Sequence, residues 1–343
     1  MKILVIKFKY LGDVVVSTPM LRALRQRFPQ AELHVLIPEE AVPLLKYVPW
    51  LDKVWGFPRQ RGRMQLKKTM PLLTQLRAEK FDLSLDFVGN DRGAWTSFMI
   101  GAKERWGLEA PRGFLGRSWC YHHTTEQPDY DLYYEGLREL MILDAMGMGT
   151  GSRDTRLEIY TNPDLKAKAA ELLPEGTILC HISSVQLKKE WPLEYWREFS
   201  IKAASRGLRL MFSAGISERE QLSLRALANP DLGITCLPPV YDLELFLAIL
   251  QRAKLFVSAD TGPLHFAVGL QTPTLSFFAP SDYLRWAPVG EPHTTIRGKE
   301  CECSKKSHVC YNQSPCMASI KPEQAMEAVE RAIFAKKMQE VVV

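Results

Sequence analysis

A glycine and an aspartate, Gly12 and Asp13, follow the apolar run of residues 2–7. The carboxyl ends of parallel strands face the binding crevice of a sheet, so Asp13 would project towards a ligand. A carboxylate there could act as a general base on a hydroxyl group. Aspartate is also a favoured helix N-cap. The local sequence leaves both interpretations open.

A second group of such residues, Asp260-Thr-Gly-Pro-Leu-His265, follows the apolar run of residues 254–259. Pro263 suits the first turn of a helix, and Gly262 lets a ligand approach the backbone closely. Free N–H groups and the helix dipole then favour an anion such as a diphosphate. The alternative is an ordinary helix start that binds no ligand, with His265 buried in the core. The combination of residues in this segment favours a ligand-binding site. The chain has no GxGxxG and no GxxxxGK[ST], which disfavours NAD binding and P-loop chemistry.

A third segment offers hydroxyl groups and a cation. Ser183 and Ser184 follow the apolar run of residues 177–182, and Lys189 comes shortly after them. A fixed cation stabilises the negative charge that develops on a departing diphosphate. A solvated loop with two lysines is the alternative interpretation.

Five basic residues without an acid gather at Arg59, Arg61, Arg63, Lys67 and Lys68. Such a run is usually a solvated face. Arginines also bind carboxylates and phosphates through two hydrogen bonds at once. No nucleic-acid motif accompanies the run, and a net charge of +5 does not demand a nucleic acid. The run therefore indicates a place where an anionic acceptor approaches.

Four of the seven cysteines form a C-x-C-x6-C-x5-C cluster at Cys301, Cys303, Cys310 and Cys316. Four thiolates could bind zinc, but the paired CxxC spacing of most structural zinc sites is missing. Reduced thiols or an occasional disulfide are favoured, and no metal site is predicted.

The elements that must position these residues follow from hydrophobic periodicity. Strands are predicted at 2–7, 32–37, 53–56, 81–87, 177–182, 208–213, 254–259 and 273–278. Helices are predicted at 18–28, 39–46, 64–79, 130–146, 193–206, 217–228, 241–252, 263–269 and 322–337. Strands alternating with helices predict parallel βαβ units, and the pattern restarts after a candidate linker at 148–154. A length of 343 residues suits two such α/β domains with a cleft between them.

The start of the chain bears on localisation. No run of about 18 apolar residues is present. Lys7 and Lys9 stand where a signal peptide needs its apolar centre. A cytoplasmic protein is expected.

Three quoted segments together resemble the lipopolysaccharide heptosyltransferase family, glycosyltransferase family 9. They are KYLGDVVVSTPMLRALRQRFPQAELHVL, KKEWPLEYW and SADTGPLHFAVGLQTPTLSFFAPSDYLRWAP. The Cys-rich tail is also similar to that family. The resemblance implies an α/β protein of GT-B fold, with two Rossmann-like domains facing a cleft. It further implies an N-terminal acceptor-binding domain over 1–150, a C-terminal nucleotide-sugar-binding domain over 151–321, and a C-terminal helix at 322–343 that packs back toward the first domain.

The resemblance also implies an activity. The enzyme would move heptose from ADP-heptose to the Kdo/heptose inner core of lipopolysaccharide with inversion, without a metal or other cofactor. Its partners would be the ADP-sugar and a lipid-linked acceptor, with peripheral association with the cytoplasmic face of the inner membrane and no nucleic acid. Another nucleotide sugar or surface glycan, a nucleotide-sugar epimerase, and a non-catalytic binding protein are the alternatives.

Site residues carry over by motif. Asp13 matches the general base and Lys189 the cation facing the departing phosphate. The donor-binding residues would be Ser183, Glu218, Asp260, Thr261, Gly262, Leu264 and His265. The acceptor-binding residues would be Arg59, Arg61, Arg63 and Arg92. The segment around Glu218 departs from the glycine-rich form common in the family.

Overall fold

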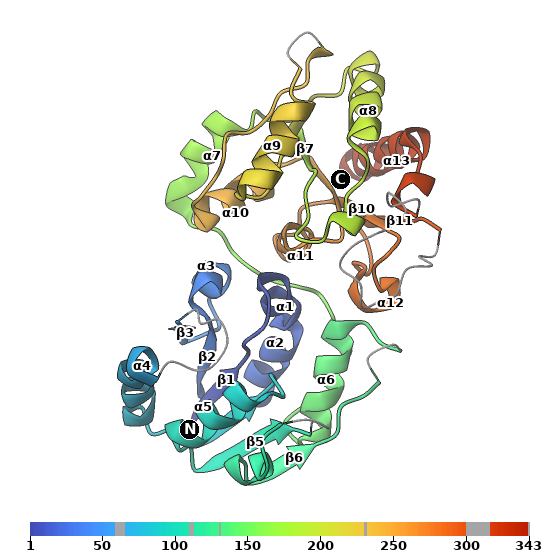
Figure 1. Cartoon of the computed structure of the whole chain (residues 1–343). Coiled ribbons are helices and arrows are strands. Elements are labelled where there is room, and N and C mark those ends of the chain that lie inside the picture. The colour runs from blue at the N-terminus through green and yellow to red at the C-terminus, as the bar shows by residue number, and fades with distance from the viewer. Residues whose placement is uncertain (59–65, 110–112, 130–131, 230–231, 300–315, 342–343) are drawn as a thin grey trace. The chain divides into compact units, whose positions relative to one another are not determined.

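The chain forms two compact units, Met1–Tyr160 and Thr161–Val343 (Figure 1). The computed structural model describes residues 1–58, 66–109, 113–129, 132–229, 232–299 and 316–341. The division falls after the predicted linker because residues 154–158 are tied to the first unit. Arg22 pairs there with Asp154 at 3.2 Å and with Glu158 at 3.1 Å.

The first unit is built on a six-stranded, fully parallel sheet. Its strands are β1 (Lys2–Ile6), β2 (Glu32–Pro38), β3 (Lys53–Phe57), β4 (Leu83–Asp86), β5 (Glu104–Leu108) and β6 (His123–Thr125). Its α-helices are α1 (Leu11–Val16), α2 (Thr18–Arg27), α3 (Val42–Leu45), α4 (Leu66–Ala78), α5 (Asp91–Ile100) and α6 (Glu135–Ala145). The order β3-β2-β1-β4-β5-β6 is that of a Rossmann sheet, whose ligands bind at the carboxyl ends where the order reverses, here between β1 and β4.

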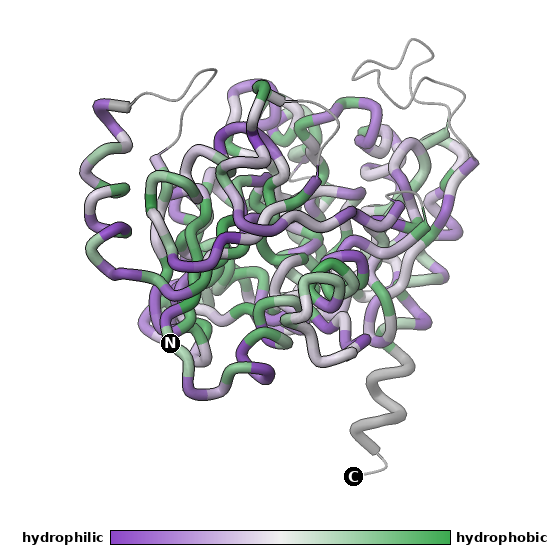
Figure 2. Tube along the Cα trace, turned by 90° about the horizontal axis from the view of Figure 1, so that it is seen from below, coloured by the Kyte–Doolittle hydropathy of each residue, from purple (hydrophilic) through white to green (hydrophobic). Residues whose placement is uncertain are grey.

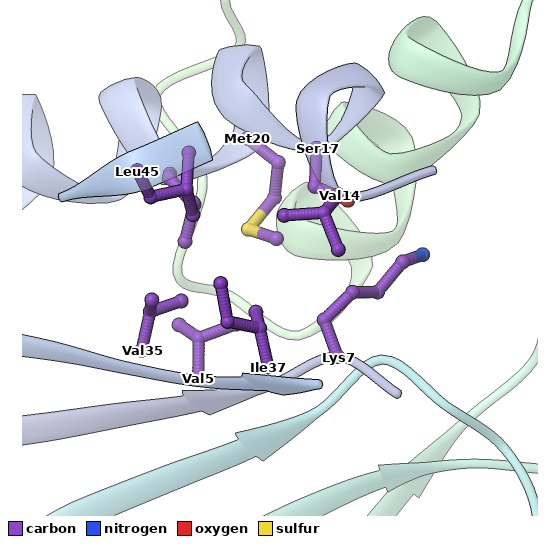
Figure 3. Close-up of a pocket in the computed structure, with 9 residues that line it drawn as sticks. Val5, Lys7, Val14, Ser17, Met20, Val35, Ile37 and Leu45 are labelled. Carbon is purple, nitrogen blue, oxygen red and sulfur yellow. The ribbon is translucent and has the colours of Figure 1, made fainter. Parts of the chain in front are cut away.

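Alternation along β1 explains how helices cover both faces of this sheet. Leu4 and Ile6 belong to one apolar cluster with Leu73 and Leu76 of α4. Val5 points the other way and lies beside residues of α1 and α2 (Figure 3). Because a strand buried on both faces needs apolar residues at every position, the run Ile-Leu-Val-Ile has no polar interruption.

The second unit carries a five-stranded parallel sheet in the order β11-β10-β9-β7-β8. Its strands are β7 (Ile178–His181), β8 (Leu210–Ser213), β9 (Leu255–Ala259), β10 (Thr274–Phe278) and β11 (His293–Arg297). Its α-helices are α7 (Lys166–Leu172), α8 (Leu193–Ser205), α9 (Glu218–Leu227), α10 (Leu243–Arg252), α11 (Gly262–Gly269), α12 (Tyr283–Trp286) and α13 (Pro322–Val341).

The start of α13 belongs to the core of the second unit. Met326 and Val329 are buried in the same apolar cluster as Trp191 and Trp196. The Trp191 indole N–H donates to the carbonyl of Ile320 at 2.9 Å. In the hydropathy colouring of Figure 2 the interior segments are mostly green. Packing of the last helix toward the first domain stays a prediction.

Every strand and helix that the periodicity predicts has a counterpart, with ends shifted by a few residues. The prediction omitted α1, α5, α7, α12, β5, β6 and β11. These elements are short or lack a clear apolar period, so local sequence gives them little signal. Among the described residues, no helix is both long and apolar enough to cross a membrane.

Candidate active site

Three loops of the second unit follow the adjacent strands β9, β7 and β8 at the carboxyl edge of the sheet. Asp260 comes directly after β9, Ser183 comes after β7, and Gly215 comes after β8. His181 pairs in register with both Ser213 and Ser258, so the three strands end at the same level. The sheet therefore brings together segments that lie far apart in the sequence.

Asp260 lies between two basic side chains. Its Oδ2 is 2.5 Å from Nζ of Lys189, and its Oδ1 is 3.9 Å from Nε2 of His265. Burial alone would raise the pKa of this carboxyl, but the attraction of Lys189 and His265 outweighs burial and holds the pKa below its usual value. The predicted residues 189, 260 and 265 thus form one cluster of charged or ionisable side chains.

The start of α11 offers backbone donors beside that cluster. Thr261 is the N-cap, with extended backbone and no side-chain capping bond. Its Oγ1 is buried and has no hydrogen-bond partner among the described residues. The Leu264 N–H donates to the Thr261 carbonyl at 3.2 Å, and Pro263 has no N–H. The amides of Thr261 and Gly262 are therefore the donors that an anion could use, whereas the Leu264 side chain is fully buried in the core.

Ser183 is held by a residue that the sequence analysis missed. Its hydroxyl donates to Oε1 of Glu220 at 2.9 Å and accepts the Gly215 N–H at 2.8 Å. Glu220 also completes a capping box with Ser217. The sequence signal for it was the S-x-x-E spacing. Glu218, the predicted donor contact, is exposed in the first turn of α9, and its role stays a prediction.

A salt bridge fixes the loop that carries Lys189. One carboxylate oxygen of Glu190 accepts the Ser184 N–H at 2.8 Å and pairs with Arg219 at 2.8 Å. The other guanidinium nitrogen of Arg219 donates to the Ser184 carbonyl at 2.7 Å. This bracket joins the loop after β7 to the start of α9, so the loop backbone is ordered around the cluster.

In the first unit, Asp13 lies in the first turn of α1, just beyond the carboxyl end of β1. The N-cap of α1 is Tyr10 and that of α2 is Ser17, so the interpretation of Asp13 as a helix cap is wrong. Its side chain is half-buried, and its carboxylate makes no hydrogen bond to a described residue. Its predicted role as the general base stays a prediction.

A buried group of charges lies next to Asp13. Lys7 and Glu139 form an ion pair in which both side chains are almost fully buried, and Arg138 pairs with Glu135 at 2.7 Å. Burial alone would lower the pKa of Lys7, but the attraction of Glu139, Glu135 and Asp13 raises it above its usual value. In Figure 3 the amine of Lys7 points away from the apolar side chains of Val5 and Ile37.

Asp86, at the end of β4, is a second buried carboxyl of this edge. Tyr121 donates its hydroxyl to Oδ2 at 2.5 Å, and the Val88 N–H donates to Oδ1 at 2.7 Å. Burial raises the pKa of Asp86 to about 6, although both hydrogen bonds and the charges of Arg117 and Lys7 act in the opposite direction.

Of the four predicted acceptor-binding arginines, the structure describes one. Arg92 lies in the first turn of α5. Arg59, Arg61 and Arg63 lie outside the described residues, as do Cys301, Cys303 and Cys310. Cys316 is buried in the core of the second unit.

Glu32, His34 and Glu79 are close enough together to hold a metal ion. Nζ of Lys2 lies 2.7 Å from Glu79 and 3.2 Å from Glu32, so an ammonium already balances these carboxylates. The Trp55 indole donates to Nδ1 of His34 at 3.2 Å, which leaves the ring proton on Nε2, facing Glu32 at 2.8 Å. This group is therefore an ion-pair network at the amino ends of β1 and β2.

Two parallel α/β units with charged loops at their carboxyl edges form an α/β protein of GT-B fold. A family model described as glycosyltransferase family 9 (heptosyltransferase) matches residues 69–314. This chain belongs to that family.

Relatives extend the similarity beyond the matched segment. Lipopolysaccharide heptosyltransferase 3 of Escherichia coli K12 is 22% identical over 334 residues, which cover 95% of this chain and 96% of the relative. A family 9 glycosyltransferase from Veillonella parvula has a TM-score of 0.84 at 19% identity, over 97% of both chains. The E. coli ADP-heptose lps heptosyltransferase II has a TM-score of 0.80 at 18% identity, over 98% of this chain and 100% of the other.

Proposed function

We propose that this enzyme transfers heptose from ADP-heptose to the Kdo/heptose inner core of lipopolysaccharide, with inversion at the anomeric carbon. The observation that carries the proposal is the cluster of Lys189, Asp260 and His265 at the start of α11. Membership in a heptosyltransferase family supports the choice of sugar. A relative whose printed name includes ADP-heptose supports the choice of nucleotide.

The second domain, 151–321 in the sequence-based division, would bind the donor. A diphosphate at the amides of Thr261 and Gly262 would face Nζ of Lys189 across Asp260. As the phosphate enters, it would share the lysine charge that Asp260 holds in the free enzyme. Asp260 would then be able to accept hydrogen bonds from the hydroxyls of the sugar. The Ser183 hydroxyl, which donates to Glu220 in the free enzyme, would turn to donate to a phosphate oxygen.

The first domain, 1–150, would bind the acceptor. Asp13 would remove the proton from the acceptor hydroxyl, and that oxygen would attack the anomeric carbon from the face opposite the diphosphate. The bond between the anomeric carbon and the phosphate oxygen breaks, and ADP leaves with the bonding electron pair. Lys189 and the N-terminus of α11 would stabilise the charge on ADP. Arg59, Arg61, Arg63 and Arg92 would contact the anionic groups of the core.

The test measures ADP release from ADP-heptose by the full chain, with and without a heptose-deficient lipopolysaccharide core. Asp13→Asn should lower acceptor-dependent release by about 100-fold or more, because general-base catalysis contributes roughly 10²–10⁴-fold. Its affinity for ADP should not change. Asp164→Asn, an exposed site in the second unit, is the matched control and should behave like wild type.

Two results would contradict different parts of the proposal. Full activity of Asp13→Asn would remove Asp13 from the base role. Absence of release with every core acceptor, while ADP still binds, would point to another surface-glycan acceptor or nucleotide sugar within the same family.

A further inference from the structure

Large apolar side chains stand out into solvent from neighbouring parts of the first unit. They come from α4, α5 and the segment 113–120, and they are Met70, Trp95, Phe98, Leu115 and Trp119. Trp119 is 82% exposed and Leu115 is fully exposed. Single exposed apolar residues are ordinary, but a connected group of this size marks an interaction site.

A ring contact joins two of these side chains, and a shared groove adds a third. Trp95 and Phe98 lie one turn apart on α5, with ring centroids 6.3 Å apart. Trp95 also stacks on Phe114 at 5.1 Å. Phe98 and Met70 line a shallow groove of about 370 Å³ between α4 and α5 (Figure 1 labels both helices).

The segment 113–120 is anchored on α5 at its buried end and by an ion pair. Cys120 and the neighbouring Tyr121 are buried against Ala94 of α5. Arg117 lies 3.6 Å from Asp91 at the start of the same helix. With Cys120 facing inward, its neighbour Trp119 faces solvent.

The charges around this surface are mostly positive. Lys67, Lys68, Arg77, Arg92 and Arg117 stand on α4, α5 and 113–120, against the single acid Asp91 on the same segments. Asp91 is itself neutralised by Arg117. Arg105, from β5, lies over the Phe98 ring at 5.9 Å. Tryptophan and phenylalanine among basic residues suit the interface of a bilayer with anionic lipids. The attraction between each basic residue and such a surface contributes about 1 kcal/mol to binding.

We propose that this surface, formed by α4, α5 and residues 113–120, docks the enzyme on a bilayer that contains anionic phospholipids. Trp95, Phe98, Leu115 and Trp119 would enter the headgroup region, and the exposed Lys67, Lys68 and Arg77 would lie against the lipid phosphates. The inference adds to the proposed function, on which it rests in one respect. A lipid-linked acceptor lies in the same bilayer, so docking would raise its concentration at the first domain.

The test is co-sedimentation of the full chain with vesicles of phosphatidylcholine plus phosphatidylglycerol, and with vesicles of phosphatidylcholine alone. Wild type should bind the anionic vesicles and lose this binding at high salt. Trp119→Ser combined with Leu115→Ser should weaken binding at least about tenfold, because two exposed apolar side chains no longer enter the bilayer. Lys67→Glu with Lys68→Glu should abolish the preference for anionic vesicles. Ile201→Ser, on an exposed position of α8 in the second unit, should bind like wild type.

Activity separates this proposal from the proposed function. The Leu115/Trp119 variant should keep wild-type turnover on a deacylated, water-soluble core acceptor and lose turnover on the lipid-linked acceptor in vesicles. Failure of wild type to bind anionic vesicles, or equal binding by the variant, would overturn the docking surface while leaving the transfer reaction intact. A wild-type dimer that the variant converts to monomers would instead assign the surface to a second copy of the chain.

Discussion

Lys189 and Asp260 neutralise each other's charge. The contribution of this ion pair to stability can be measured separately from its contribution to catalysis. In Lys189→Met the buried Asp260 carboxylate loses its cation at 2.5 Å, so the second unit should lose roughly 2 kcal/mol of unfolding free energy. The double variant Lys189→Met with Asp260→Asn should recover that stability, because no buried charge remains. Neither variant should recover turnover. Denaturant unfolding and single-turnover rates give the two readouts.

If the double variant regained turnover, Lys189 would serve only to balance Asp260. Lys168→Met, at an exposed lysine of α7 in the same unit, is the control. Its activity should stay near that of wild type, since the proposed contact to the diphosphate belongs to Lys189.

Asp86 predicts a dependence of stability on pH. Its folded pKa of about 6 lies above the value of roughly 3.9 of an unfolded aspartate. The native state therefore binds the proton more tightly, and this carboxyl costs stability as pH rises from about 4 to about 6. Asp86→Asn removes that titration, so its stability relative to wild type should rise across this window by up to roughly 3 kcal/mol and then level off. Urea unfolding of both proteins at several pH values measures the difference, and a difference constant from pH 4 to 7 would contradict the raised pKa.

The candidate site shows which residue positions a sequence can predict. Asp13, Lys189 and Asp260 were predicted because each follows a recognisable strand, and strand ends meet at one edge. Glu220 and Glu139 were missed because their partners lie 37 and 132 residues away, at Ser183 and Lys7. Local patterns contain no information on such pairs.

At the scale of the element, Gly262 offers a test of the N-terminus of α11. A Cβ built there meets only the Phe266 ring, at an ordinary 3.6 Å, so the fold has room for alanine. Gly262→Ala should leave thermal stability unchanged within about 1 kcal/mol. It should weaken ADP binding about tenfold or more, because the methyl group keeps the diphosphate away from the backbone amides. Isothermal titration with ADP, beside a melting curve, distinguishes the two effects.

The matched control is Gly215→Ala, where a Cβ would come within 2.4 Å of the Glu220 carboxylate. That variant should lose both stability and ADP affinity, since it displaces the acid that holds Ser183. Wild-type ADP affinity in Gly262→Ala would mean that the start of α11 is a plain helix start without a ligand.

Strong elements were predicted well for a physical reason. Buried parallel strands such as β1 and β9 are continuous apolar runs, and α2 and α10 are amphipathic, so both types are visible in a short window. α1 was missed because its six residues include few polar positions and show no period. β11 was missed because it is mostly polar and its partly buried residues show no alternation. Tertiary pairing with β10 makes β11 a strand, and that pairing is not written in its own five residues.

At the scale of the whole molecule, the restart of the βαβ pattern predicted two units. The boundary moved from 150 to 160 because Arg22 reaches the segment 154–158 from α2, another pair distant in sequence. The proposed division of work gives the donor to the second unit and the acceptor to the first.

That division of work predicts where ADP acts on the molecule. The proposed donor contacts all lie in the second unit, on the loops 183–190, 215–220 and 260–265. Saturating ADP should therefore slow hydrogen exchange of these loops and leave the amides of Met1–Tyr160 unchanged. An ADP concentration of about 100 times the dissociation constant stabilises the native state by roughly 2.7 kcal/mol. The midpoint temperature of unfolding of the second unit should therefore rise with ADP concentration. Asp13→Asn should show the same protection as wild type, because its proposed role begins only with the acceptor. Protection concentrated in the first unit would reverse the assignment of donor and acceptor domains.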